Sequence, residues 1–450
     1  MDDKKKEKKK LALVLAGGGS RGAYQIGVWK AMRKLGLSID LVTGISVGAL
    51  NGAFVMQDYF DQAEKMWSTI STPDVIDYDP KSSEDFTDYT RNLISLAVKA
   101  FSQGGIKTGP LRRLIDNYLM DQDQLDQLPV QFGLVVTNDE TKEREEYFVN
   151  NRPRQEICDL LMASASLFPL LEKTRIGQED YIDGGYRNHI PLSLAQSQDP
   201  DIIVVVDIFP EKKAELEGRL DNVLLVRPTW PLGDMLVFDW RRSQRNIRLG
   251  YNDFMKACGH YYGYYYSFYD QGIFLKQNLV KILVAARKQE GSRAQLLLAI
   301  LKNARKIQKQ VESKWDWKIG RNNYHLALLE VCGKLFSLPP EPVYTVKGFI
   351  QVLVSRIKQV QQMDKDNISQ IYMPNYQLSY QEWLTYFYQR LAPLPDQDRI
   401  LTLVEQFKQG DWGLDSLANR LFFQVDPTSF ALAVFIYELM ENERNLIQEN

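Results

Sequence analysis

A serine flanked by glycines is the first residue in this sequence with a type and setting suited to chemistry. The segment Gly44-Ile45-Ser46-Val47-Gly48 lies between a short strand-like segment and a helix-like one. A serine in a sharp strand-to-helix turn presents its hydroxyl at a helix N-terminus, and only small neighbours fit such a turn. The helix dipole also favours negative charge that develops there. Ser46 is therefore a candidate nucleophile, with Gly44 and Gly48 supporting the turn.

A run of glycines upstream is the second candidate. Gly17-Gly18-Gly19-Ser20-Arg21-Gly22 follows the apolar run Leu11–Ala16. Consecutive glycines let several backbone N–H groups converge on one anion, which in acyl transfer is the tetrahedral oxyanion. The same string also fits a dinucleotide-binding loop. That alternative needs an acidic residue at the end of the second strand, whereas Asp40 stands at the start of it.

A carboxylate followed by two glycines is the third candidate. Asp183 comes after Tyr181-Ile182 and before Gly184-Gly185. A nucleophilic serine needs a base, and a carboxylate held in a dry pocket beside the hydroxyl can take its proton. His189 leaves open a Ser–His–Asp triad instead. From composition and spacing alone, Asp-Gly-Gly can equally be only a turn.

The elements around these residues alternate between strands and helices. Strands are predicted at 11–16, 40–43, 130–136, 202–208 and 223–226, and helices at 24–35 and 47–56. Strands separated by helix-length segments predict an α/β fold with a parallel sheet covered on both faces. Neighbouring strands of such a sheet present their C-terminal ends to one crevice. The glycine run and the serine turn should therefore face each other.

Two other regions have a different character. Residues 71–128 are looser, with helices expected at 89–101 and 110–119, and we interpret them as an insertion. Beyond about 270 the apolar residues recur at helical spacing. Two such stripes are Ile300, Ala304, Ile307 and Val311, and Val346, Phe349, Leu353, Ile357 and Val360. Ser379 with Glu382 forms a capping-box pattern. The last 180 or so residues are therefore predicted to be all-helical.

Composition excludes several classes of protein. Of the 450 residues, 55 are Lys or Arg and 57 are Asp or Glu, and this balance argues against nucleic acid as a partner. The three cysteines lie far apart, which fits neither a disulfide framework nor a zinc site but suits a reducing compartment. The three histidines are equally scattered, so a metal centre is not expected.

The length of the apolar stretches and the charge of the N-terminal tail indicate where in the cell the protein acts. The longest stretches are far below the roughly 20 residues that span a bilayer. Residues 1–10 contain six lysines, which predicts a solvated tail, with contact to anionic lipid as the alternative. We therefore expect a cytoplasmic protein that acts peripherally at membranes.

The three motifs together resemble the patatin-like phospholipases, which carry similar motifs in the same order. The resemblance covers about residues 11 to 258 and includes further matching positions: Gly105-Ile106, Pro110-Leu111, Ala163-Ser164, Pro169, Pro191 and Gly250-Tyr251. Two departures stand out. The stretch from Ala163 to Pro169 is compressed relative to common members, and the helical extension after about 270 lies outside the family domain.

The resemblance implies a three-layer α/β/α sandwich with a mostly parallel sheet and a lipid acyl hydrolase with a Ser–Asp dyad. By position it makes Ser46 the nucleophile and Asp183 the base. It places the oxyanion hole at the backbone N–H groups of three glycines, Gly17, Gly18 and Gly19. Arg21 would lie at the rim, where it either contacts a lipid phosphate or fixes the loop through a salt bridge. The residues supporting the motifs are Arg21, Gly22, Gly44, Gly48, Gly184 and Gly185.

We therefore expect a Lys-rich tail at 1–10, a patatin-like catalytic domain at 11–265 with a looser helical insertion at 71–128, and a helical C-terminal domain at 270–450. The catalytic domain should hydrolyse carboxylic esters of lipids through an acyl-enzyme, without a metal or organic cofactor. The helical domain should cover or regulate it and is a candidate site for a partner. Three alternatives remain: a Ser–His–Asp esterase of α/β-hydrolase type, a nucleotide-binding protein using the Gly17–Gly22 loop, and a silent lipid-binding scaffold.

Overall fold

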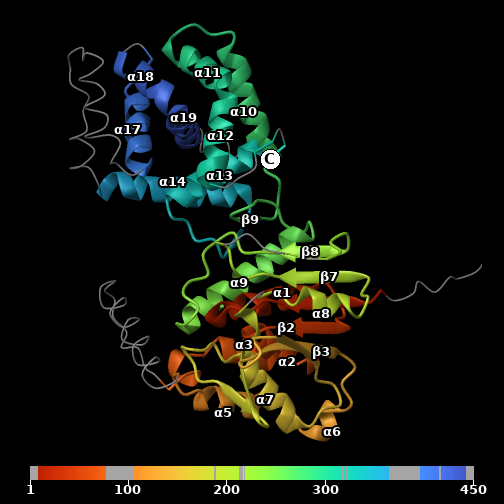
Figure 1. Cartoon of the computed structure of the whole chain (residues 1–450). Helices are drawn as coiled ribbons and strands as arrows, with labels where there is room; N and C mark the ends of the chain where they lie inside the picture. The colour runs from red at the N-terminus through yellow and green to blue at the C-terminus, as the bar shows by residue number, and fades with distance from the viewer. Residues whose placement is uncertain are drawn as a thin grey trace, which may run out of the picture. The chain divides into compact units, whose positions relative to one another are not determined.

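The computed structural model divides the chain into two compact units, residues 1–259 and 260–450 (Figure 1). The residues that it describes are 9–77, 105–186, 189–211, 216, 218–315, 319–320, 322–363, 396–414 and 417–441. Three expectations lie outside these residues: the first eight positions of the Lys-rich tail, the helix at 89–101, and the capping box at Ser379 and Glu382.

The N-terminal unit is built on an eight-stranded sheet with the order β5-β6-β3-β2-β1-β7-β8, and β4 also pairs with β3. Five strands run parallel: β1 (Leu11–Leu15), β2 (Leu41–Gly44), β3 (Gln131–Asn138), β7 (Ile202–Val206) and β8 (Val223–Val226). These confirm the strands predicted from continuous apolar runs. Three further strands were not predicted: β4 (Arg144–Phe148), β5 (Thr174–Ile176) and β6 (Glu179–Asp183). Both β4 and β6 run antiparallel to β3, so the sheet is mixed.

The pairing of β3 brings two strand ends together. β4 pairs with residues 133–137 of β3 and therefore occupies one of its edges. On the other edge, β2 pairs with residues 131–134 and β6 with residues 136–138. Because β2 is parallel and β6 antiparallel to β3, their C-terminal ends meet. Gly44 lies opposite Leu134, and Asp183 lies opposite Val136.

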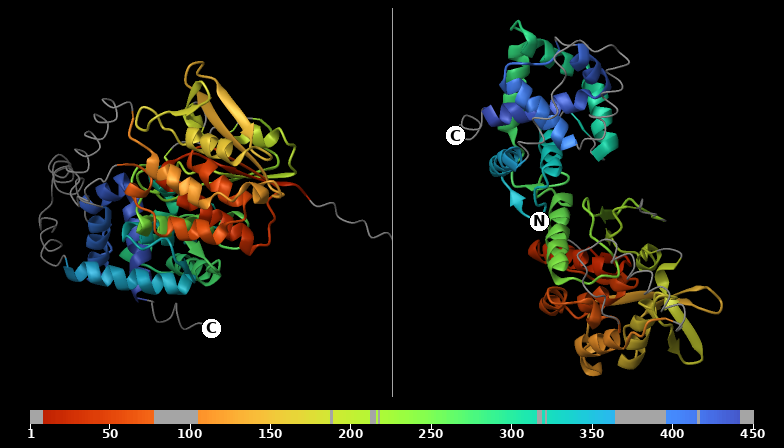
Figure 2. Two further views of the ribbon diagram at one scale, coloured as in Figure 1. Left: turned by 90° about the horizontal axis from the view of Figure 1, so that it is seen from below. Right: turned by 90° about the vertical axis from the view of Figure 1, so that its left-hand side faces the viewer.

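Helices cover both faces of this sheet (Figure 2). Successive side chains of a strand point to opposite faces. On β3, Phe132 contacts the site of Gly52 on one face, whereas Gly133 lies against Leu194 on the other. These contacts place α2 (Val47–Met56) and α8 (Leu192–Gln196) on opposite faces, which gives the three layers of the predicted sandwich. The other helices described in this unit are α1 (Ala23–Lys34), α3 (Phe60–Trp67), α5 (Gly109–Tyr118), α6 (Gln122–Leu125), α7 (Arg154–Ser164) and α9 (Trp240–Ala257).

The C-terminal unit is mainly helical, as predicted. Its described helices are α10 (Ile273–Ala286), α11 (Ser292–Lys302), α12 (Ala304–Trp315), α13 (Tyr324–Leu335), α14 (Val346–Met363), α17 (Asp396–Lys408), α18 (Leu417–Val425) and α19 (Pro427–Glu441). A short parallel pair, β9 (Ser267–Phe268) with β10 (Val343–Tyr344), adds strands that were not expected. The second apolar stripe lies buried on α14. The first is divided, because Asn303 separates α11 from α12.

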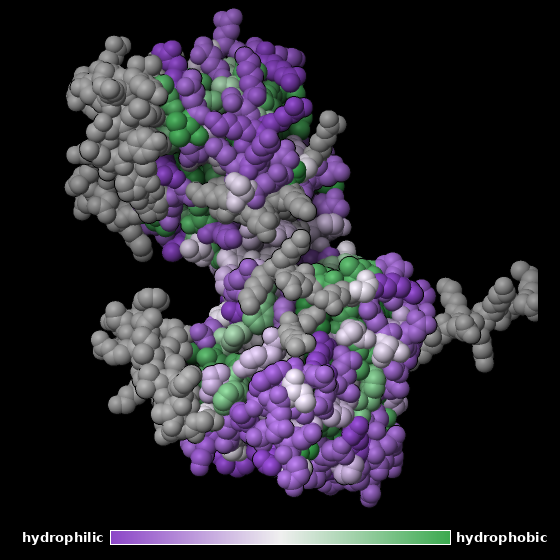
Figure 3. Space-filling view, viewed as in Figure 1, coloured by the Kyte–Doolittle hydropathy of each residue, from purple (hydrophilic) through white to green (hydrophobic). Residues whose placement is uncertain are grey.

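Polar residues cover most of the described surface that is visible in Figure 3. Among the described helices, none combines the length and the apolar character needed to cross a bilayer.

Candidate active site

Ser46 occupies the sharp turn between β2 and α2. Its φ of 54° and ψ of −126° are strained for a residue other than glycine. The backbone is crowded on both sides of it. A Cβ atom at Gly44 would lie 2.2 Å from the Gly48 carbonyl oxygen, and one at Gly48 would lie 2.2 Å from the Leu15 carbonyl oxygen. Only glycine fits at these two positions, which explains the spacing of the motif.

The turn is anchored by a second serine. The Ser46 backbone N–H donates a 3.0 Å hydrogen bond to Ser164 Oγ, and that hydroxyl donates a 2.7 Å bond to the Val135 carbonyl oxygen. Ser164 is the last residue of α7 and is fully buried. In the sequence, Ser164 stands out only as part of the Ala163-Ser164 pair, and this role was not predicted. The residue type gave little indication of this role, because a buried serine near a helix end is common.

Asp183 ends β6 and is 3% exposed. Its carboxylate accepts a 2.7 Å hydrogen bond from the Gly185 backbone N–H. Burial raises the pKa of Asp183 to about 6, although the Gly185 N–H and the neighbouring Ser46 hydroxyl act to lower it. Gly184 packs tightly here, since a Cβ atom would lie 2.4 Å from the Val135 carbonyl oxygen. The structure therefore brings together the serine and the carboxylate that the sequence singled out.

The glycine loop lies beside the same serine. A Cβ atom at Gly17 would lie 3.3 Å from Ser46 Cβ. The Gly17 N–H, however, donates a 3.0 Å hydrogen bond to the His189 carbonyl oxygen. In the described part of the chain, the N–H groups of Gly18 and Gly19 donate no hydrogen bond. The Gly17 N–H therefore already has a partner, and the oxyanion hole expected at Gly17, Gly18 and Gly19 stays a prediction.

These groups open onto a cavity of about 360 Å³. Its walls are mainly apolar and include Val47, Leu50, Phe54, Met66, Trp67, Ile70, Leu111, Leu114, Leu167, Leu170, Leu171 and Phe238. Gly18, Gly19, Ser46, Asp183 and His189 also line it. The cavity thus places Ser46 and Asp183 beside room for an apolar chain. A larger cavity of about 520 Å³ lies within the helical unit, but its described lining contains no serine, cysteine, histidine or aspartate.

Comparison with known families agrees with this geometry. Residues 13–195 match the family described as patatin-like phospholipase. This segment is therefore similar to the patatin-like phospholipases. The match contains all three motifs, and it ends before β7, so the last two parallel strands of the sheet lie beyond it.

Individual relatives match the same part of the chain. The patatin-like phospholipase domain-containing protein 7 of Rattus norvegicus is 24% identical over 218 residues, which are 47% of this chain and 14% of that protein. The lysophospholipase nte1 of Aspergillus terreus is 27% identical over 205 residues, or 44% of this chain and 12% of that protein. This chain thus spans only a small part of the length of these relatives. The crystal structure of VipD from Legionella pneumophila is 14% identical with a TM-score of 0.33, covering 98% of this chain and 92% of that one.

Arg21 of the patatin-like domain fixes the glycine loop. Its guanidinium forms two 3.0 Å hydrogen bonds with the Glu211 carboxylate, and its Nε donates a 2.8 Å bond to the Gly233 carbonyl oxygen. The same group lies 5.3 Å from the centre of the Phe209 ring. Of the two roles expected for Arg21, these contacts favour the salt bridge. Gly22 is equally constrained, because a Cβ atom there would lie 2.5 Å from Val47 Cγ2.

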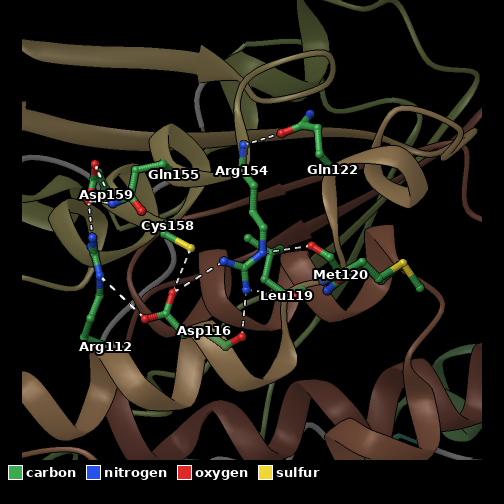
Figure 4. Close-up of polar contacts among 10 residues, drawn as sticks. Arg112, Asp116, Leu119, Met120, Gln122, Arg154, Gln155, Cys158 and Asp159 are labelled. Atoms are coloured by element: carbon green, nitrogen blue, oxygen red, sulfur yellow. Dashed lines mark hydrogen bonds and ion pairs between the residues drawn. The ribbon is translucent and has the colours of Figure 1, made fainter.

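A polar network joins residues next to the cavity (Figure 4). It joins α5, which contributes Leu111 and Leu114 to the lining, to α7. Arg112 pairs with Asp159 at 2.6 Å, and Arg154 donates a 2.7 Å hydrogen bond to the Asp116 carbonyl oxygen. The Cys158 thiol donates to Asp116 Oδ1 at 3.4 Å. Burial and this contact raise the pKa of Cys158 to about 11, so its thiol is a poor nucleophile at neutral pH.

The contacts of His189 and Asp40 bear on two alternatives, a Ser–His–Asp triad and a nucleotide-binding loop. Within the described residues, His189 forms no hydrogen bond with Ser46 or Asp183, and its Nε2 lies 3.4 Å from Asp207 Oδ1. Asp183, and not His189, is the titratable group beside the Ser46 hydroxyl, and this geometry favours the dyad over a triad through His189. Asp40 accepts a 3.0 Å hydrogen bond from the Leu11 N–H at the start of β1, at the opposite end from the glycine loop. It therefore cannot serve a nucleotide bound at that loop.

Proposed function

We propose that the patatin-like domain is a lipid acyl hydrolase of phospholipase A type that cleaves carboxylic esters with Ser46 and Asp183. One observation carries this proposal. Ser46 and the buried carboxylate of Asp183, whose pKa burial raises to about 6, line the same apolar cavity. A carboxylate with such a pKa is mostly ionised at neutral pH and is still basic enough to accept a proton in the transition state.

The reaction follows from this arrangement. Asp183 takes the hydroxyl proton as Ser46 Oγ bonds to the acyl carbon, and the carbonyl electrons move to oxygen. The Gly18 and Gly19 N–H groups stabilise that oxyanion. When the tetrahedral intermediate collapses, the ester C–O bond breaks and the leaving alkoxide receives the proton from Asp183. Water then attacks the acyl-enzyme by the same route and releases a fatty acid, with no cofactor involved.

The substrate class is argued from the cavity walls. Aliphatic and aromatic side chains dominate the lining, so a fatty acyl chain fits there better than a polar acyl group. The name lysophospholipase carried by one relative agrees with an acyl ester of a phospholipid. The proposal includes access to the substrate from a membrane surface. It places the enzyme in the cytoplasm, which the three unpaired cysteines support. Its catalytic domain is taken to span 11–265 and its helical domain 270–450.

The test combines covalent labelling with turnover. The full chain should react with a fluorophosphonate probe at Ser46 and release fatty acid from phospholipid or lysophospholipid vesicles. Ser46→Ala should lose both properties, and Asp183→Asn should lose hydrolysis. Ser193→Ala, which alters an exposed serine on α8, should keep both. Hydrolysis that survives in Ser46→Ala would refute the proposal. Turnover that survives in Asp183→Asn but is lost in His189→Gln would indicate a histidine-dependent esterase.

A further inference from the structure

We propose that His189 is a positioning residue for the oxyanion loop, acting through its hydrogen bond to Asp207; this inference rests on the proposed hydrolase function. His189 bridges two adjacent strand ends. Its carbonyl oxygen accepts the Gly17 N–H just after β1, and its Nε2 lies 3.4 Å from Asp207 Oδ1 just after β7. β1 and β7 are parallel neighbours, with Leu15 opposite Val206.

Asp207 is a rigid attachment point for the imidazole. Its side chain is 1% exposed. Its Oδ2 accepts a 2.8 Å hydrogen bond from Arg227 Nε, and its Oδ1 accepts a 3.1 Å bond from the Phe209 N–H. A buried carboxylate with these donors is held in one orientation, because moving it would break its ion pair with Arg227 and its hydrogen bond from Phe209. His189 is thus tied to a fixed point rather than to a mobile side chain.

The contacts of His189 reach the loop from two sides. Through Gly17 it holds the main chain directly before the two proposed donors. Through its ring, which lies 4.8 Å from the Phe209 ring in an edge-on arrangement, it also limits the position of that phenyl group. Phe209 lies beneath the loop, since a Cβ atom at Gly18 would be 3.5 Å from Phe209 Cε2. Loss of the imidazole would therefore loosen Gly18 from both directions.

The atom that makes the bond determines the choice of variants. Asp207 is contacted by Nε2, which the amide nitrogen of glutamine can replace, whereas the shorter side chain of asparagine reaches only the Nδ1 position. His189→Gln should therefore restore function that His189→Asn and His189→Ala lack. This contrast separates a hydrogen bond at Nε2 from a general loss of bulk. His260→Gln, at an exposed histidine of the other unit, serves as the matched control.

The experiment measures kcat, KM and the rate of fluorophosphonate labelling at Ser46 in the full chain, with thermal unfolding in parallel. We expect His189→Ala and His189→Asn to lower kcat and the labelling rate together by about 10- to 100-fold, because both reactions use the oxyanion donors. KM should change by less than about threefold, since uniform binding is not affected. His189→Gln should stay within about fivefold of the wild type, and His260→Gln should match it.

Three results would overturn the inference. His189→Ala with wild-type kcat would show that the loop does not depend on the imidazole. His189→Gln as impaired as His189→Ala would show that the ring itself, and not its hydrogen bond, is required. A rise in KM with kcat unchanged would assign His189 to substrate binding. If His189→Ala fails to fold, the comparison of the glutamine and asparagine variants decides. A wild-type chain without Ser46-dependent hydrolysis would instead refute the proposed function.

Discussion

The backbone N–H of Ser46 donates a 3.0 Å hydrogen bond to the side-chain hydroxyl of Ser164. Because Ser164 Oγ also donates to the Val135 carbonyl oxygen, one buried hydroxyl links the strained turn to β3. The strain of the turn is thus maintained by a contact from outside the motif. The turn owes its geometry to α7 as well as to its own glycines.

Ser164→Ala should weaken both stability and reactivity. The substitution leaves the Ser46 N–H and the Val135 carbonyl without their partner in a buried setting, at a cost of about 1–3 kcal/mol in the free energy of unfolding. The rate of fluorophosphonate labelling at Ser46 should fall as the turn relaxes. Denaturant unfolding and labelling kinetics measure the two effects. If Ser164→Ala labelled at the wild-type rate, the turn at Ser46 would keep its conformation without the Ser164 hydroxyl.

Activity should fall in acid as Asp183 becomes protonated. Only the ionised carboxylate can accept the Ser46 proton, and the pKa of Asp183 is raised to about 6 by burial. We expect kcat/KM to lose about tenfold per pH unit below that value and to level off above it. A pH–rate profile on a soluble ester of short chain length measures this. An acid limb centred near pH 4 would contradict the effect of burial on this carboxylate.

Asp183→Asn should stabilise the fold at neutral pH while abolishing hydrolysis. The pKa of Asp183 is raised from 3.8 to about 6 in the folded chain, so the folded state binds this proton more tightly than the unfolded state does. The stability that protonation contributes is present below pH 3.8 and is lost as the pH rises through about 6.

The side-chain amide introduced by Asp183→Asn stays neutral, so this variant does not lose stability as the pH rises. Asp183→Asn should therefore gain stability over the wild type between pH 4 and pH 7, by up to about 3 kcal/mol. Thermal or denaturant unfolding at the two pH values measures the difference. If the two proteins differed in stability by the same amount at pH 4 and pH 7, titration of Asp183 could not be the cause.

Gly19→Ala should abolish activity, whereas Gly36→Ala should not. Both glycines have positive φ, 57° and 69° respectively, so alanine is strained at either site. A Cβ atom at Gly19 would also lie 2.2 Å from the Met235 carbonyl oxygen, while nothing lies within 4 Å of one at Gly36. We expect a loss of about 1–2 kcal/mol in stability for Gly36→Ala with hydrolysis retained. Similar activity in the two variants would argue against a tightly covered loop.

The parallel strands and the loops after them were predictable because their signals are local. Leu11–Ala16 is an unbroken apolar run, as expected of a strand buried on both faces, and the glycines after it mark its end. The same holds for Ile202–Ile208. The turn at Ser46 follows from the types of its immediate neighbours. For such segments, the sequence alone predicts the elements that carry the candidate residues.

The contacts between distant segments were not predictable. Glu179–Asp183 is short and half polar, so nothing in it indicates an antiparallel strand that ends beside β2. The hydrogen bond from Gly17 to His189 joins main-chain atoms, and main-chain atoms carry no residue-type signal. Ser164 and Asp207 act through partners far away in the chain. Their roles become visible only when the fold is known.

The short pairing between β6 and β3 has a consequence for variation among related sequences. Asp183 faces the serine because it lies opposite Val136, and a slip of one residue would turn the carboxylate toward the other side of the sheet. Insertions and deletions should therefore be tolerated in the exposed turn at 140–143 but eliminated by selection between 179 and 183. A segment that looks like an ordinary surface hairpin would then be among the parts of the chain least free to change in length.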